Sequence, residues 1–127
     1  MINKAGDVVL VRYSNMNGTA ASGIFLIVYD EAVDNGTQHG NNICALKITT
    51  STSSISSYYT QLDLGKDTFF DKQCWVVCNK LNIFNKTQIT KKLGRIDKVE
   101  LLKVYNQYKD FSNQIEKQML SSIMGIR

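Results

Sequence analysis

Residues 76–97 read VVCNKLNIFNKTQITKKLGRID, and the order of elements in this stretch decides the fold. A hydrophobic strand ends in the polar run Cys78–Lys80, and the short strand-like segment Leu81–Phe84 follows it. A basic element comes next. Asp97, with Glu100 three residues later, then fits the N-cap of a helix and its reciprocal capping partner. The stretch therefore predicts a β-rich body followed by a helix from about Lys98.

Further strands are predicted on the N-terminal side of this stretch. Runs of β-branched, aromatic and other apolar residues, separated by polar and glycine-containing loops, are typical of short strands. The runs cover residues 8–13, 24–29, 43–50, 58–64 and 69–78, with the last one centred on 74–77. Many short strands followed by a helix predict a mainly β fold with a C-terminal helix, built as a small, partly closed SH3-like barrel.

The last third of the chain changes to a helical period. Apolar residues recur at helical spacing from Leu101 to Met119, and the chain contains no proline that would break a helix. One long helix or two abutting helices are expected. The apolar stripe is explained most simply by packing on the sheet, but a stripe this long could also overhang the barrel and meet another chain.

Length and composition indicate one cytoplasmic domain. With 127 residues and no internal repeat, residues 1–127 are expected to form a single barrel domain with a helical C-terminal extension from about 98. The chain has no recognisable secretory leader and no apolar run of membrane-spanning length. Cys44, Cys74 and Cys78 are expected to be free thiols, and one histidine with scattered acids predicts neither a metal site nor a cofactor.

The formal net charge of +4 is unevenly distributed. Residues 80–103 contain seven basic and two acidic side chains, whereas residues 1–40 contain two basic and four acidic ones. A basic half of this kind indicates a polyanion or an acidic protein as partner. A solvated lysine-rich surface is the plainer alternative.

Several segments together resemble the MazF/PemK toxins, small bacterial ribonucleases. The segments are Gly6–Val8, Lys47–Thr50, Asn79–Leu81 and Leu93–Asp97, and the resemblance covers roughly residues 5–111. It implies an SH3-like barrel with a terminal helix that cuts single-stranded RNA without a metal. It also implies a homodimer that is silenced by an acidic antitoxin protein.

The resemblance also suggests which residues carry the chemistry. Thr49 falls on the threonine that the family uses for catalysis, and Lys47 shares its face of the strand. Lys80 lies where the family binds RNA. We expect RNA to be bound by the following residues: Lys47, Lys80, Asn82, Lys91 and Lys92.

The chain departs from the family at two cationic positions. Residues 20–24 read AASGI where the family has its catalytic arginine, and Asn82 stands where the family has a second basic residue. In the resembled family, the ribose 2′-hydroxyl attacks the adjacent phosphate and forms a charged phosphorane. Another cation must therefore stabilise this phosphorane. Arg12, on the preceding strand, is the first candidate because its permanent charge and forked donors suit phosphate oxygens.

Two other functions are compatible with the sequence. One is a degenerate barrel of the same family that binds RNA or protein without cutting. The other is an unrelated SH3-like adaptor, whose protein-binding face would be formed by Tyr13, Tyr29, Tyr58, Tyr59 and Trp75. The only histidine, His39, lies in a polar loop, where a solvated role is the simpler interpretation.

Overall fold

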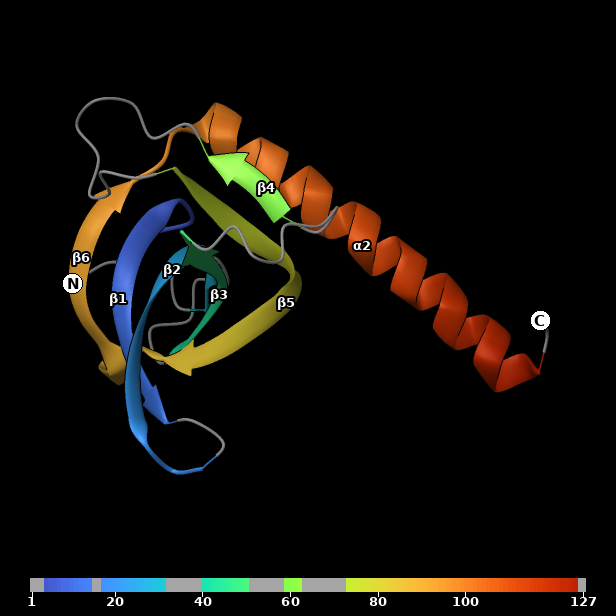
Figure 1. The fold of residues 1–127 in the computed structure, drawn as a ribbon, viewed down its shortest axis with the longest axis horizontal. Helices are drawn as coiled ribbons and strands as arrows, with labels where there is room; N and C mark the ends of the chain where they lie inside the picture. The colour runs from blue at the N-terminus through green and yellow to red at the C-terminus, as the bar shows by residue number, and fades with distance from the viewer. Residues whose placement is uncertain (1–3, 15–16, 32–39, 51–58, 63–72, 126–127) are drawn as a thin grey trace.

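A computed structural model describes residues 4–14, 17–31, 40–50, 59–62 and 73–125 of the chain. The described part contains six strands, one short 3-10 helix and one long α-helix (Figure 1). The elements are β1 (Asp7–Ser14), β2 (Ala20–Asp30), β3 (Asn42–Thr49), β4 (Tyr59–Leu62), β5 (Cys74–Asn85), η1 (Lys86–Gln88), β6 (Ile89–Arg95) and α2 (Lys98–Met124). The prediction of a mainly β fold with a C-terminal helix is confirmed.

The strands form one antiparallel sheet in the order β4-β5-β3-β2-β1-β6. β4 and β6 lie at opposite ends of this order, so the sheet is open, and it is strongly curved in Figure 1. Register shifts interrupt the ladders that β1, β3 and β5 form with their neighbours. Such irregularities increase the local bend and twist of a sheet, which explains how a six-stranded sheet curls without closing.

One prediction about the strands was wrong, and one strand was not predicted. Residues 81–84 do not form a separate strand, because β5 runs without interruption from Cys74 to Asn85. The basic element, in turn, contains the edge strand β6, which pairs with β1. Lysines are common on edge strands, where they discourage pairing with other chains, so their presence concealed the strand in the sequence.

Successive side chains of a strand point to opposite faces of the sheet, so the buried apolar residues form two separate cores. The core that we call the helix-side core contains Leu46, Ile48 and Val76, together with Val104 of α2. The groove-side core, on the opposite face of these strands, is formed by Val9, Val11, Phe25, Ile27, Ile43, Ala45 and Phe84. The residues of β3 therefore divide by parity, with even-numbered ones toward the helix and odd-numbered ones toward the other face.

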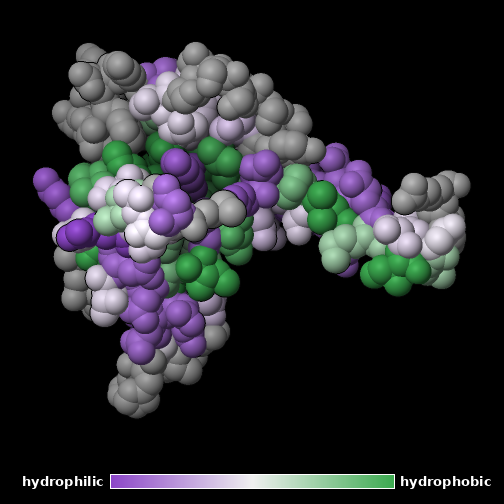
Figure 2. Space-filling view, turned by 60° about the horizontal axis from the view of Figure 1, so that its bottom comes forward, coloured by the Kyte–Doolittle hydropathy of each residue, from purple (hydrophilic) through white to green (hydrophobic). Residues whose placement is uncertain are grey.

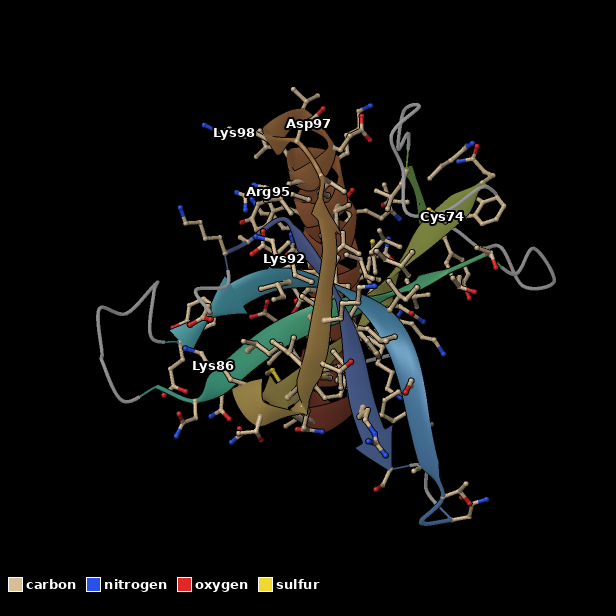
Figure 3. The ribbon with its side chains drawn as sticks, turned by 90° about the vertical axis from the view of Figure 1, so that its left-hand side faces the viewer. Cys74, Lys86, Lys92, Arg95, Asp97 and Lys98 are labelled. Atoms are coloured by element: carbon tan, nitrogen blue, oxygen red, sulfur yellow. The ribbon has the colours of Figure 1, made fainter. Side chains whose placement is uncertain are left out.

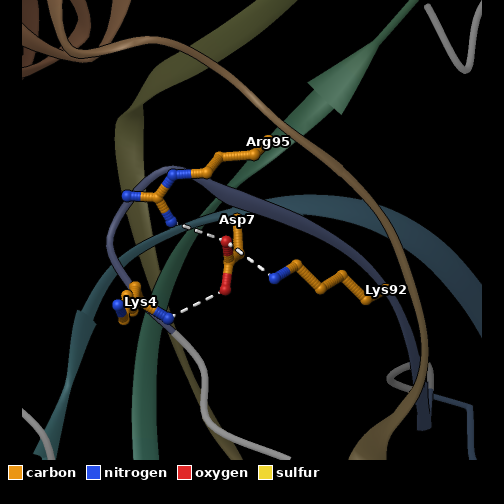
Figure 4. A network of polar contacts seen from close by, with 4 residues as sticks. All are labelled: Lys4, Asp7, Lys92 and Arg95. Atoms are coloured by element: carbon orange, nitrogen blue, oxygen red, sulfur yellow. Dashed lines mark hydrogen bonds and ion pairs between the residues drawn. The ribbon is translucent and has the colours of Figure 1, made fainter.

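A buried carboxylate joins the start of β1 to the last part of β6 (Figure 4). Asp7 is fully buried and its Oδ1 lies 2.8 Å from Nη1 of Arg95 and 3.3 Å from Nζ of Lys92. Its Oδ2 accepts a hydrogen bond of 2.9 Å from the backbone N–H of Lys4. Because a buried charge is costly unless it is paired and hydrogen-bonded, these contacts fix the start of β1 against β6.

The start of α2 follows the predicted capping only in part. Asp97 is the N-cap, and its Oδ1 accepts a hydrogen bond of 2.9 Å from the backbone N–H of Glu100. The Glu100 carboxylate accepts a bond from Nζ of Lys103 at 3.0 Å. The expected reciprocal bond from Glu100 to the Asp97 backbone is absent from the described contacts, since the carboxylate turns along the helix instead.

Only the first half of α2 covers the sheet. Val104 is buried, and Leu101 and Tyr108 pack against the helix-side core. From residue 112 onward the described side chains are exposed, and the helix projects away from the sheet (Figures 1 and 2). α2 is a single helix that overhangs the body. No helix in the described ranges is long and apolar enough to cross a membrane.

Candidate nucleic-acid interface

A groove of about 490 Å³ opens on the face of the sheet opposite α2. Ten residues from β1, β2, β3, β5 and η1 line it: Tyr13, Ser14, Phe25, Lys47, Val77, Lys80, Asn82, Ile83, Phe84 and Gln88. None of these ten described lining residues is acidic. The groove therefore brings together three of the predicted RNA-binding residues, from strands that are distant in the sequence.

The shape of the groove arises from a bulge in β5. Leu46 pairs with Leu81, but Ile48, two residues along β3, pairs with Val76, so β5 carries extra residues at this point. Extra residues in one strand bend it away from its neighbour. Lys80 lies in this bulge, and Asn82 and Phe84 follow it along the groove.

Thr49 continues the groove-side face of β3 beyond Lys47. The two residues are separated by Ile48, which points into the helix-side core, so Thr49 and Lys47 share the opposite face. Thr49 pairs with Trp75, two residues before the groove-lining Val77. Thr49 thus lies next to the groove along β3, although it is not among its lining residues, and its side chain is partly buried.

Lys47 and Lys80 differ from most cations of the basic region. Neither forms an ion pair within the described ranges, and both are exposed. By contrast, Lys86 lies 3.0 Å from the buried carboxylate of Asp30, and Lys92 lies 3.3 Å from that of Asp7. In Figure 3 Lys86 is well separated from Lys92 and Arg95, which share Asp7. Lys92, which is predicted to bind RNA, therefore already pairs with a buried carboxylate.

Arg12 does not belong to the groove. Its neighbour Tyr13 lines the groove, so alternation directs Arg12 to the opposite face of β1. There it borders a separate, more open depression of about 510 Å³ with Leu10, Ala20, Ala21, Ser22 and Thr90. Lys91 is exposed and pairs with Leu10, on the β6 side of β1. Thr49 and Arg12, predicted together as catalytic residues, are thus not brought to one groove.

Three aromatic rings form a cluster in the groove, and the sequence assigned only Tyr13 among them to a candidate site, the protein-binding face of an adaptor. The ring centroids of Phe25 and Phe84 are 4.7 Å apart, and those of Tyr13 and Phe25 are 6.0 Å apart. These residues come from β1, β2 and β5, and only the cross-strand register reveals that they meet. In the sequence, only the odd or even position of each ring within its strand indicated which face of the sheet it would take.

A comparison of the sequence with protein families decides the classification. Residues 4–111 match the model described as "PemK-like, MazF-like toxin of type II toxin-antitoxin system". The chain belongs to this family of toxins. No curated protein sequence matches the chain. Membership excludes the unrelated SH3-like adaptor, and it leaves the last part of α2 outside the matched segment.

Solved structures share the MazF-like fold with this toxin-family chain at low sequence identity. An endoribonuclease from a mycobacterial species, solved with its cognate antitoxin, has a TM-score of 0.66 and 15% identity, over 88% of this chain and 96% of that one. The MazE–MazF structure from Deinococcus radiodurans has a TM-score of 0.64 and 14% identity, over 100% of both chains. The Mycobacterium tuberculosis toxin MazF-mt6 has a TM-score of 0.61 and 13% identity, over 83% and 96%. These similarities establish the fold.

The three cysteines of this MazF-like chain are free, as predicted. Cys74 and Cys78 lie in the helix-side core, where burial raises the pKa of Cys74 to about 11. Burial also raises the pKa of Cys78, and burial followed by the charge of Glu31 raises that of Cys44. Thiols with raised pKa values remain protonated near neutral pH and are poor nucleophiles. In the described part of the chain, no three His, Cys, Asp or Glu residues gather as a metal site would require.

Some residues discussed above fall outside the described part of the chain. They are His39, Tyr58, and residues 63–64 and 69–72 of the predicted strands 58–64 and 69–78.

Proposed function

We propose that this MazF/PemK-family chain is an endoribonuclease that cuts single-stranded RNA without a metal. The observation that supports this proposal most strongly is the groove, in which Lys47 and Lys80 lie without a carboxylate partner within the described ranges. Two positive charges without local neutralisation attract a polyanion, and none of the described lining residues carries a negative charge that would repel it. Family membership supplies the substrate class that fits this charge.

The chemistry that fits these residues is attack of the ribose 2′-oxygen on the adjacent phosphorus. The 2′-hydroxyl loses its proton to water as the O2′–P bond forms, and the leaving O5′ takes up a proton from water as the P–O5′ bond breaks. Negative charge builds on the non-bridging oxygens between these events. In our proposal the hydroxyl of Thr49 donates to one of these oxygens, and the ammonium group of Lys47 on the same face stabilises their charge. Lys80 and Asn82 hold the strand on the other side of the groove.

A binding protein without cleavage is the second candidate. It is favoured by one specific observation, which is that no arginine is among the described residues lining the groove. An ammonium group binds phosphate as a point charge, without the paired donors of a guanidinium group. A groove of lysines therefore fits binding at least as well as transition-state stabilisation.

We also propose an acidic antitoxin and a second copy of the chain as partners. Two of the structurally similar proteins were solved with an antitoxin, and the basic groove is complementary to an acidic segment. The second copy is supported by the overhanging part of α2. There Ile115, Met119 and Ile123 recur every four residues and are 37%, 58% and 78% exposed.

Incubation with a labelled single-stranded RNA tests the catalytic proposal. We expect cleavage that persists in excess EDTA, stops when the 2′-hydroxyls are methylated, and is lost in Thr49→Ala. Products ending in a 2′,3′-cyclic phosphate would identify the attacking group. Salt-dependent binding of the same RNA with no product would support the second candidate, whereas neither binding nor cleavage would contradict both.

A further inference from the structure

The aromatic cluster in the groove has one partly exposed member, Tyr13. Phe25 and Phe84 are only 3% and 9% exposed, and they pack edge to face with their centroids 4.7 Å apart. Tyr13 is half-buried and contacts both, with centroids at 6.0 Å from Phe25 and 6.2 Å from Phe84. The two phenylalanines therefore hold the tyrosine ring in a fixed orientation, and Tyr13 presents the cluster's accessible aromatic surface to the groove.

Gly23 provides the space for this arrangement. A Cβ atom at Gly23 would lie 2.9 Å from Cε1 of Phe25 and 3.3 Å from Cε1 of Tyr13. Real Cβ atoms do not approach ring carbons as closely as the first distance, so any side chain here would displace the cluster. The rings of Phe25 and Tyr13 therefore pack directly against the backbone of β2 at Gly23.

A hydrogen-bond acceptor faces the same groove. Nδ2 of Asn82 donates to the carbonyl oxygen of Lys80 at 3.3 Å and, more weakly, to that of Ala45 at 3.5 Å. Since both partners are acceptors, the amide nitrogen must face them, which leaves Oδ1 as the end directed away from the backbone. Gln88 offers no such group, because its amide donates to the Arg12 carbonyl and its oxygen accepts from the Asn85 N–H.

From these contacts we propose that Tyr13 and Asn82 form a subsite for one unstacked RNA base that carries an exocyclic amino group. The base stacks on the ring of Tyr13, and its amino group donates to Oδ1 of Asn82. The flanking phosphates lie near Lys47 and Lys80, which line the same groove. This inference rests on the proposed RNA binding and adds the chemistry that the groove recognises.

The subsite explains why the partner is single-stranded RNA. An aromatic ring stacks on any exposed base face, and base–aromatic stacking supports about tenfold or more in affinity per base. A base inside a duplex is stacked on its neighbours and cannot reach the ring. Uracil has no exocyclic amino group, so it would stack without the bond to Asn82.

Binding of uncleavable oligonucleotides to the full-length protein tests the proposal. The probes are fluorescent 2′-O-methyl hexamers of adenine, cytosine or uracil, and an abasic hexamer with the same number of phosphates. We expect the wild-type protein to bind the adenine and cytosine probes about tenfold or more tightly than the abasic one. The uracil probe should bind with intermediate affinity.

Variants assign the effect to the two residues. Tyr13→Ala should lower affinity for the base-containing probes to that of the abasic probe, while Tyr13→Phe should retain the wild-type preference. Tyr13→Leu, which keeps an apolar side chain on the cluster, guards against a packing defect and should behave like Tyr13→Ala. Asn82→Ala should remove the difference between uracil and the amino-bearing bases.

The outcomes separate this inference from the function on which it rests. Equal wild-type affinity for base-containing and abasic probes would overturn the base subsite and leave RNA binding by charge intact. Binding of no probe at all would overturn RNA binding itself.

Discussion

Phe25 and Lys47 are directly opposite each other in the ladder between β2 and β3, and both line the groove. The pairing places Phe25, a buried ring that supports Tyr13, beside a cation on the neighbouring strand. Lys47 can be substituted without disturbing the core, because its ammonium group is exposed, whereas the ring of Phe25 is buried and supports the fold.

The charge of the groove is tested by matched lysine and arginine variants. Lys47→Ala and Lys80→Ala should each weaken binding of single-stranded RNA at all sequences alike. Each should also reduce the slope of log affinity against log salt by about 1, as expected for one lost phosphate contact. Fluorescence anisotropy at several salt concentrations gives this slope.

Arg12→Ala is the control, because Arg12 borders the other depression. It should leave both affinity and salt slope close to wild type. A loss of affinity with Arg12→Ala as large as that with Lys47→Ala would mean that RNA also contacts the opposite face of β1.

Gly23→Ala should disturb the groove. Its Cβ would lie 2.9 Å from the ring of Phe25, and relief of such overpacking typically costs about 1–3 kcal/mol. We expect a lower urea midpoint and weaker RNA binding. Ser22→Ala is the neighbouring control, since Ser22 is exposed. Unchanged stability in Gly23→Ala would show that the rings have room to move.

The sequence was sufficient to predict the architecture but not the site. Strands such as β2 are continuous apolar runs, and the Asp97 cap marks the start of α2 directly, so local patterns were enough for both. β6 was missed because an edge strand tolerates lysines that also occur in loops.

The groove depends on register, which local patterns do not contain. Lys47 and Lys80 were identified as binding residues, but the bulge in β5 that directs Lys80 into the groove is a property of strand pairing. Arg12 was chosen for its proximity in sequence to the loop that lacks an arginine. Arg12 does lie beside that segment in space, since it pairs with Ser22, but the same alternation that exposes Arg12 directs it away from the groove.

The raised pKa of Cys74 should make the free energy of unfolding depend on pH in the alkaline range. Its pKa is about 11 in the folded chain, against an ordinary value of 9.0. Between these values the folded state binds more protons than the unfolded state, so the free energy of unfolding falls as pH rises from about 9 to 11. Urea unfolding at pH 8 and pH 10.5 should show this loss.

Cys74→Ala provides the comparison for that pH effect. The variant should be less stable at pH 8 because a buried atom is removed, but its stability should decline less between the two pH values. Every other ionisable group is the same in the two proteins. Parallel declines in the two proteins would exclude Cys74 as the source.

The buried Asp7 carboxylate should contribute more to stability than an exposed ion pair does. Asp7→Asn removes the charge that holds Arg95 and Lys92, and we expect a loss of about 1–3 kcal/mol in the free energy of unfolding. Glu100→Gln, which weakens the helical pair with Lys103, should cost only about 0.5 kcal/mol or less. Equal effects on the urea midpoint would contradict a special role for Asp7.

The overhang of α2 should govern association rather than folding. Ile115 and Met119 lie on the part of the helix that projects from the sheet, so Ile115→Glu with Met119→Glu should leave the thermal midpoint nearly unchanged. If a second copy covers this stripe, the double variant should sediment as a monomer where the wild-type chain sediments as a dimer. Val104→Ala is the opposite control. It opens a cavity beneath the packed half of α2, and we expect it to cost about 2 kcal/mol of stability without changing the assembly. A double variant that stays dimeric would mean that the two copies meet elsewhere on the molecule.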